Sequence, residues 1–211
     1  MAMPKRVLFA RIGWMTYYAG PQNGDQRPKG GGGYNKKNVG HELFNFADFD
    51  GRLYGTARAK NGRINLARID PDVAGAQKLN GVLIIFVARQ RIVGWYCGAT
   101  VYASTNATLP ISVTKEIGRR LKDSGIRGFK FGGYRFETAV ENAVLLPTYE
   151  RIHEVPGSVK GGFGQSNVCY PYRNSGKSKR SAWMGKAIRY VLNYSRSNLL
   201  NGMDPSAETT E

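Results

Sequence analysis

Cysteine and histidine are scarce in this chain. Its two cysteines, Cys97 and Cys169, are too few for a disulfide framework, and no paired CxxC motifs complete a structural zinc site. Such cysteine usage is typical of a reducing compartment. The two histidines, His41 and His153, are far apart in the sequence and leave little for a histidine-rich metal site or a Ser-His-Asp triad. We therefore expect no metal ion and no cofactor.

Long hydrophobic runs are also missing. The N-terminal segment has too short an apolar run for a signal peptide, and no stretch approaches the length of a membrane-spanning helix. We expect a cytoplasmic protein that does not contact a membrane.

Motifs for nucleotide chemistry are incomplete. A phosphate-binding loop has a glycine five residues before its Gly-Lys-Ser, but Pro171 occupies that position before Gly176-Lys177-Ser178. The glycine run 30–33 precedes no clear helix, so it is not a dinucleotide-binding motif. No acidic residue stands two positions before a lysine, as one class of metal-dependent nucleases requires. The acid pairs Asp48/Asp50 and Asp70/Asp72 lie beside Gly or Pro, which indicates turns. Catalysis within this chain is therefore disfavoured.

Apolar runs in the middle of the chain predict strands. The expected strands are 7–12, 52–58, 64–69, 82–88, 92–102, 134–140 and 143–146. The polar turn at 89–91 predicts an antiparallel hairpin. Helical periodicity is confined to 114–123 and to 181–198, which Ser181 is placed to cap.

These elements predict one α+β domain over residues 1–200. We expect a curved, mostly antiparallel sheet or barrel with the C-terminal helix packed on it. The polar segment 201–211 is expected to be a flexible tail or a truncated linker.

Positive charge is in excess, with 31 Lys and Arg against 15 Asp and Glu and a net charge of +16. Much of it falls in two blocks, 115–135 and 173–196, which suit either phosphate contact or a solvated surface. The Gly-rich segment 160–168 predicts either a clamp on a backbone or base, or a β-bulge. The residues predicted to contact a nucleic-acid backbone are Lys36, Lys37, Arg119, Arg120, Lys122, Lys130, Lys160, Gln165, Ser166, Asn167, Arg173, Lys177, Lys179 and Arg180.

Aromatic residues flank the Gly-rich loop and recur on a strand. Successive strand side chains alternate, so Trp95 and Tyr96 are not both expected in the core. One interpretation is a core Trp95 with an exposed Tyr96; the other is an aromatic cage for an extruded base. His41 is either a polar contact in that cage or a structural histidine. The predicted pocket residues are Trp14, Tyr17, Tyr18, Tyr34, Asn35, His41, Asn45, Trp95 and Tyr96.

Three segments carry a family resemblance: YNKKNVGHELFNF (34–46), GVLIIFVARQRIVGWYCGATVY (81–102) and AVLLPTYERIHEVPGSVKGGFGQSNVCY (143–170). They resemble a prokaryotic domain found at the N-terminus of HNH and other restriction-type endonucleases, which is similar to EVE and YTH members of the PUA-like superfamily. Two features depart from that domain: no nuclease half is recognisable, and Cys169 stands where related strings have Trp.

The resemblance implies a PUA-like β-barrel with flanking helices and a pocket for one flipped, modified base. Its aromatic walls would be Trp14, Tyr17, Tyr18, Tyr34 and Trp95, with Asn35 at the base edge.

The leading hypothesis is thus a non-catalytic reader of double-stranded DNA that carries methylated or hydroxymethylated cytosine, or methyladenine. It would be the targeting module of a modification-dependent restriction system, fused to a nuclease or separate from it. The alternatives are an RNA-binding PUA-like module and, less favoured, a small nuclease or nucleotide hydrolase that uses His41, Glu42 and one of the two acid pairs.

Overall fold

The computed structural model describes residues 3–22, 25–30, 39–105, 108–127, 129, 131–157, 159–173, 175–178 and 180–202. Its strands are β1 (Val7–Arg11), β2 (Arg52–Gly55), β3 (Lys78–Ala88), β4 (Arg91–Tyr102), β5 (Phe136–Ala139), β6 (Ala143–Leu145) and β7 (Val168–Cys169). Its α-helices are α2 (Ile111–Asp123) and α3 (Ala182–Leu192), and its short 3₁₀ helices are η1 (His41–Phe44), η2 (Lys60–Gly62), η3 (Leu66–Arg68), η4 (Pro71–Val73), η5 (Val140–Asn142), η6 (Thr148–Glu150) and η7 (Leu199–Asn201). Most of the predicted tail, residues 203–211, lies outside the described residues.

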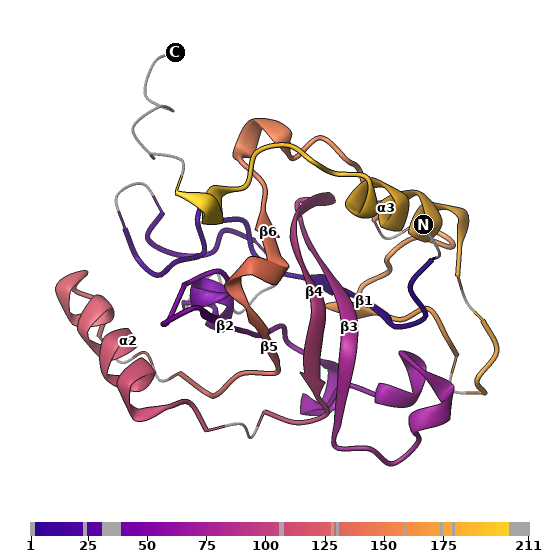
Figure 1. Ribbon diagram of the computed structural model, residues 1–211, viewed down its shortest axis with the longest axis horizontal. Coiled ribbons are helices and arrows are strands. Elements are labelled where there is room, and N and C mark those ends of the chain that lie inside the picture. The colour runs from indigo at the N-terminus through magenta and orange to yellow at the C-terminus, as the bar shows by residue number, and fades with distance from the viewer. Residues whose placement is uncertain are drawn as a thin grey trace.

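One seven-stranded sheet organises the molecule (Figure 1). The strand order is β2-β5-β4-β3-β1-β7, and β6 pairs with β4 off this path. β1 runs parallel to β3, and the other pairs are antiparallel. The α+β class is confirmed. The predicted barrel is wrong for the described residues, because β2 and β7, at the two ends of this path, do not pair with each other and the sheet stays open.

The predicted β3–β4 hairpin is confirmed, and its turn is unusual. Ala88 pairs with Arg91, so Arg89 and Gln90 form a two-residue turn. Their φ angles of 48° and 61° are left-handed, a conformation for which such turns favour Asn-Gly. The backbone N–H of Val155 donates to the Gln90 carbonyl (2.8 Å) and helps to hold the turn. The hairpin therefore presents Arg89 from a fixed backbone position.

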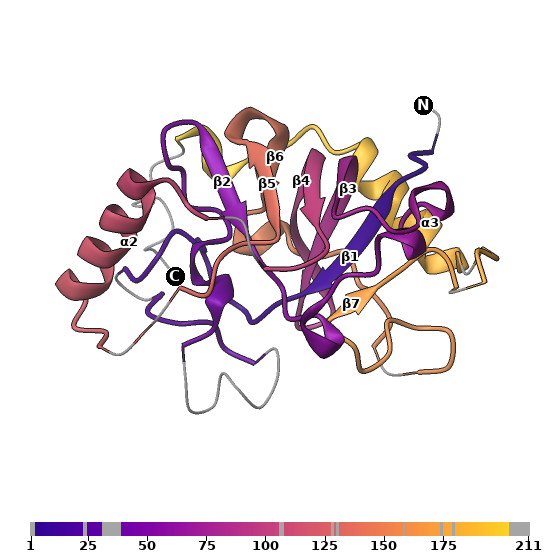
Figure 2. The same ribbon diagram turned by 90° about the horizontal axis from the view of Figure 1, so that it is seen from below.

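Both faces of the sheet are buried. α3 packs on one face, where Met184 and Ile188 join a cluster with Phe9 and Trp95. The other face carries a larger core that includes Tyr96. In two perpendicular views α2 lies toward the β2 end of the sheet and α3 toward the β1 end (Figures 1 and 2). Trp95 and Tyr96 are only 3% and 0% exposed, so the expectation that one of them lies outside the core is wrong.

Two other predictions need correction. Residues 64–69 are predicted as a strand, but the segment contains η3. The apolar Leu66 and Ile69 are three residues apart, and a turn of 3₁₀ helix buries both of them. The C-terminal helix ends at Leu192 rather than at 198, with Asn193 as its C-cap. The turn at Asp70 is confirmed, since its carboxylate accepts from the backbone N–H of Asp72 at the start of η4. In the described part of the chain, no helix is long and apolar enough to cross a membrane.

Candidate functional site

A basic pocket lies at the carboxyl ends of the parallel strands β1 and β3. Arg11, the last residue of β1, pairs with Val87 of β3, so both carboxyl ends meet there. The pocket has a volume of about 400 Å³. Its lining consists of Arg11, Ile12, Lys29, Gly30, Arg89, Gln90 and Gly157. Among these described residues three are cationic and none is acidic, so the pocket favours an anionic ligand.

The three cations differ in how firmly they are held. Nη2 of Arg11 donates to the Gly164 carbonyl (2.7 Å), and its guanidinium lies 4.4 Å from the ring centroid of Phe163. Burial lowers the pKa of Arg11, although an arginine stays protonated at neutral pH. Lys29 and Arg89 are exposed, and neither side chain forms a hydrogen bond or ion pair with another described residue. They are therefore available to a ligand.

Trp14 lies next to this pocket. Its backbone N–H donates to the Lys29 carbonyl (2.7 Å), and the Lys29 N–H donates back to the Trp14 carbonyl (2.8 Å). The guanidinium carbons of Arg89 and Arg151 lie 5.0 and 4.9 Å from its ring centroid. The ring is half-buried. Trp14 is thus a half-buried aromatic side chain beside the cationic pocket.

The backbone around Trp14 is held by polar side chains from nearby and from distant parts of the chain. Two carboxylates accept from backbone N–H groups: Glu42 from Gly13 (2.9 Å), and Asp25 from Thr16 and Tyr17 (2.8 and 2.7 Å). Two side chains donate to backbone carbonyls: the Tyr18 hydroxyl to Gly13 (2.7 Å), and the Arg151 guanidinium to Met15 and Thr16 (both 2.5 Å). Burial raises the pKa of Tyr18 well above its ordinary value, so its hydroxyl stays a neutral donor. These bonds preorganise the loop that carries Trp14.

The structure does not gather the predicted base-pocket residues in one place. Trp95 packs under α3, with its ring centroid 5.2 Å from that of Tyr194. Tyr96 is on the opposite face, and its hydroxyl donates to the Asn45 carbonyl. The Asn45 side chain is fully buried: it donates to the Thr56 carbonyl and accepts from the Thr56 N–H, both at 2.9 Å. These contacts give the three residues packing roles.

The remaining predicted pocket residues lie elsewhere. Tyr18 is fully buried in the loop described above, and Tyr17 is half-buried beside it. His41 begins η1, and its ring centroid lies 5.5 Å from that of Phe129. Burial lowers the pKa of His41, which favours the neutral ring. Tyr34 and Asn35 lie outside the described residues.

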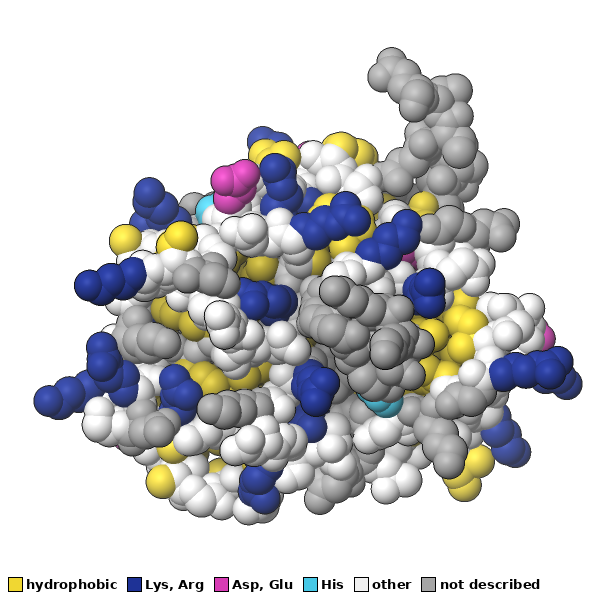
Figure 3. Space-filling view, turned by 180° about the vertical axis from the view of Figure 1, so that it is seen from behind, with side chains coloured by type: hydrophobic (Ala, Val, Ile, Leu, Met, Phe, Trp, Pro, Cys, Tyr) yellow, Lys and Arg dark blue, Asp and Glu magenta, His cyan; other side chains and the backbone are white. Residues whose placement is uncertain are grey.

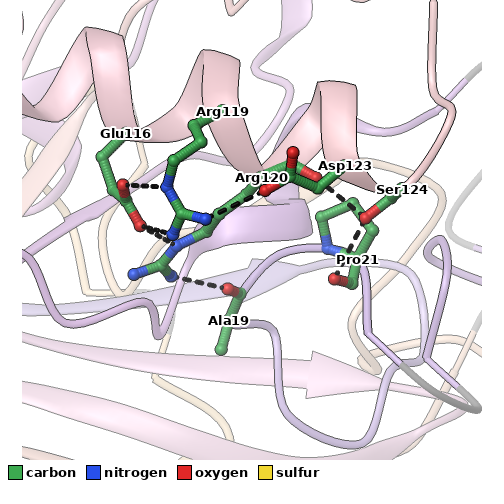
Figure 4. A network of polar contacts seen from close by, with 7 residues as sticks. All are labelled: Ala19, Pro21, Glu116, Arg119, Arg120, Asp123 and Ser124. Carbon is green, nitrogen blue, oxygen red and sulfur yellow. Dashed lines mark hydrogen bonds and ion pairs between the residues drawn. The ribbon is translucent and has the colours of Figure 1, made fainter.

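Two α2 residues that were predicted to contact a nucleic-acid backbone, Arg119 and Arg120, form ion pairs within the protein instead (Figure 4). Arg119 pairs with Glu116 (2.7 Å) and Asp123 (2.9 Å), and Arg120 pairs with Glu116 (2.8 Å). Arg120 also donates to the Ala19 carbonyl (3.0 Å) and so ties α2 to the segment that follows Tyr18. Part of this positive block is therefore neutralised, and Arg120 has a structural role.

The Glu116 carboxylate gives a pH-dependent prediction. Hydrogen bonds from Arg119 and Arg120 lower its pKa from 4.5 to about 2. A carboxylate whose pKa is lower in the folded than in the unfolded protein stabilises the fold at pH values above its unfolded-state pKa. This stabilisation is lost as the pH falls through about 2, the pKa in the folded protein. We expect Glu116→Gln to lower the melting temperature slightly near neutral pH, since exposed pairs contribute little. The difference from the wild type should shrink as the pH falls from about 5 to about 2, as measured by thermal melts.

Glu141→Gln is the matched control for this prediction. Glu141 is exposed and forms no ion pair with another described residue. Its substitution should change the melting temperature little at any pH. A Glu116→Gln difference that stays constant across the acidic range would contradict the role given to the α2 ion pairs.

The other predicted backbone contacts are dispersed. Lys122, Lys160, Gln165, Ser166, Arg173 and Lys177 are exposed. Asn167 is half-buried, and its carbonyl accepts from Arg11 N–H (2.7 Å). Arg180 donates to the Pro4 and Lys5 carbonyls (2.8 and 2.9 Å). Lys36, Lys37, Lys130 and Lys179 lie outside the described residues. On the face in Figure 3, basic side chains are spread widely and acidic ones are few.

Sequence reasoning identified Trp14 but missed the cations around it. Arg11 lies within the predicted strand 7–12 and is the last residue of the observed β1. Arg89 occupies a two-residue turn that lacks the usual Asn-Gly, and this departure was the one available signal in the sequence. Nothing in the local sequence marked Lys29 or Arg151. Among the described residues, no group of three or more His, Cys, Asp and Glu is placed to hold a metal ion.

Comparisons of the chain with protein-family models, curated proteins and solved structures find no significant match.

Proposed function

We propose that this chain is a non-catalytic reader of modified DNA with a PUA-like fold, and that the basic pocket receives one nucleotide. The observation that supports this most strongly is the combination of Arg11, Lys29 and Arg89 with the ring of Trp14 at one edge of the sheet. A volume of about 400 Å³ lies within the range of pockets that hold small organic ligands. Cations suit the phosphate, and the aromatic ring suits the base.

The proposed grip on the duplex is independent of sequence. A net charge of +16 and the dispersed, exposed side chains of Lys122, Lys160, Arg173 and Lys177 suit contacts with backbone phosphates. Phosphate contacts release condensed counterions, so the affinity should fall steeply with salt concentration. The selective part of the binding then belongs to the pocket.

A base inside a duplex reaches such a pocket only by leaving the helical stack. Flipping costs a few kcal/mol, and stacking on an aromatic side chain returns about 1–3 kcal/mol per base. Shape and a few hydrogen bonds would then discriminate a modified base from an unmodified one. In this proposal DNA cleavage belongs to a nuclease, fused or separate, with which the reader acts in a prokaryotic cytoplasm.

Binding to matched oligonucleotides tests the proposal. Fluorescence anisotropy would compare duplexes with and without one methylcytosine, hydroxymethylcytosine or methyladenine, and RNA of the same sequence, at two salt concentrations. We expect one modified duplex to bind about tenfold or more tightly than its unmodified partner, which corresponds to about 1.4 kcal/mol. Equal affinities for every DNA pair would refute the reader function, and tighter binding to RNA would replace it with the RNA-binding alternative.

A further inference from the structure

In the free protein the guanidinium of Arg89 lies over the ring of Trp14, 5.0 Å from the ring centroid. We propose that an incoming nucleobase replaces Arg89 on this ring, and that the displaced Arg89 then binds a phosphate next to that base. The inference rests on the proposed function and adds a residue that the ligand must move. The exchange is favourable because a stacked base contributes more than an exposed cation–π contact and because the released guanidinium gains an anionic partner.

The exchange takes place at Arg89 because Arg151, the other cation on the ring, is immobilised. Arg151 is 1% exposed, and it donates to the carbonyls of Leu146 (2.9 Å), Met15 and Thr16. Arg89 is exposed, and its side chain forms no hydrogen bond or ion pair with another described residue. Its guanidinium instead lies over the ring of Trp14, which neighbours the pocket.

The backbone beneath Arg89 stays in place while the side chain moves. The turn is closed by the Ala88–Arg91 pair, and Ile92 N–H donates to the His153 carbonyl (3.1 Å) just beyond it. A left-handed φ at a non-glycine residue costs energy and persists where its surroundings fix it. Arg89 lines the pocket with Arg11 and Lys29, so a phosphate held by those two cations lies near the released guanidinium.

The test uses the modified duplex that binds best and an otherwise identical duplex with an abasic site at the modified position. Wild-type protein should prefer the base-bearing duplex about tenfold, and its tryptophan fluorescence should be quenched by that duplex and not by the abasic one. Trp14→Leu should abolish this preference, so that the base-bearing and the abasic duplex bind with about equal affinity. Arg89→Ala should keep the preference and reduce the slope of log K against log salt by about one.

Two controls complete the design. Arg58→Ala removes an exposed arginine from the segment after β2, at the far end of the sheet, and should affect the salt slope less than Arg89→Ala. Trp14→Phe keeps a ring and should retain part of the base preference while losing the quenching, which separates stacking from misfolding.

The outcomes distinguish the two proposals. If no duplex binds, the proposed function fails. If the modified duplex binds selectively but Arg89→Ala leaves the salt slope unchanged, or Trp14→Leu keeps the full preference for the base, the reader stands and the exchange is refuted.

Discussion

Replacing Arg151 with methionine is expected to lower the free energy of unfolding by about 3–5 kcal/mol, because it removes a buried guanidinium that pairs with three backbone carbonyls. The Arg151 side chain is almost fully buried and donates to the carbonyls of Leu146, Met15 and Thr16. Methionine fills much of the space but donates no hydrogen bond. Each carbonyl left unpaired costs about 1–3 kcal/mol.

Urea denaturation measures this effect, with Arg58→Met as the matched control. Arg58 is exposed, so its substitution should change stability by no more than about 0.5 kcal/mol. Arg151→Lys keeps the charge but not the planar fork of donors, and should fall between the wild type and Arg151→Met. A loss below about 1 kcal/mol for Arg151→Met would show that the carbonyls find other partners.

Asn45→Ala is expected to lower the free energy of unfolding by about 2–4 kcal/mol, because it leaves two buried backbone groups unpaired. The sequence predicted that Asn45 lines the base pocket, whereas the structure directs its side-chain amide to both backbone groups of Thr56. At a temperature where the variant is folded, its affinity for nucleic acid should match that of the wild type.

Thermal melts and binding curves on the same samples decide between these roles. Asn65→Ala is the control, since Asn65 is exposed and its side chain forms no capping bond at η3. It should be close to neutral in both assays. An Asn45→Ala protein with wild-type stability but lost base discrimination would restore the base-reading role.

Local patterns predicted the elements whose formation depends on near neighbours. The apolar run in β3 and the polar turn after it predicted the hairpin, and helical spacing predicted α2. The same patterns did not show how many faces of the sheet are covered. Alternation placed Trp95 and Tyr96 on opposite faces correctly, but only the packing of α3, far along the chain, buries Trp95 as well.

The site was harder to predict because its residues meet through tertiary structure. Arg11 and Arg89 are neighbours because β1 lies parallel to β3, a pairing that no short-range pattern indicates. The charge blocks were misleading for the opposite reason. Glu116 stands three and four residues before Arg119 and Arg120, a spacing that predicts ion pairs on a helix, so part of that block is neutralised.

The position of β1 also has a consequence for the order of folding. β1 is near the N-terminus, yet it lies between β3 and β7 and pairs with strands from much later in the chain. The β3–β4 hairpin closes through a two-residue turn, so it is expected to form early, whereas β1 must wait for a long loop to close. Formation of the basic pocket, which needs β1 and that hairpin together, is then expected to be a late step in folding.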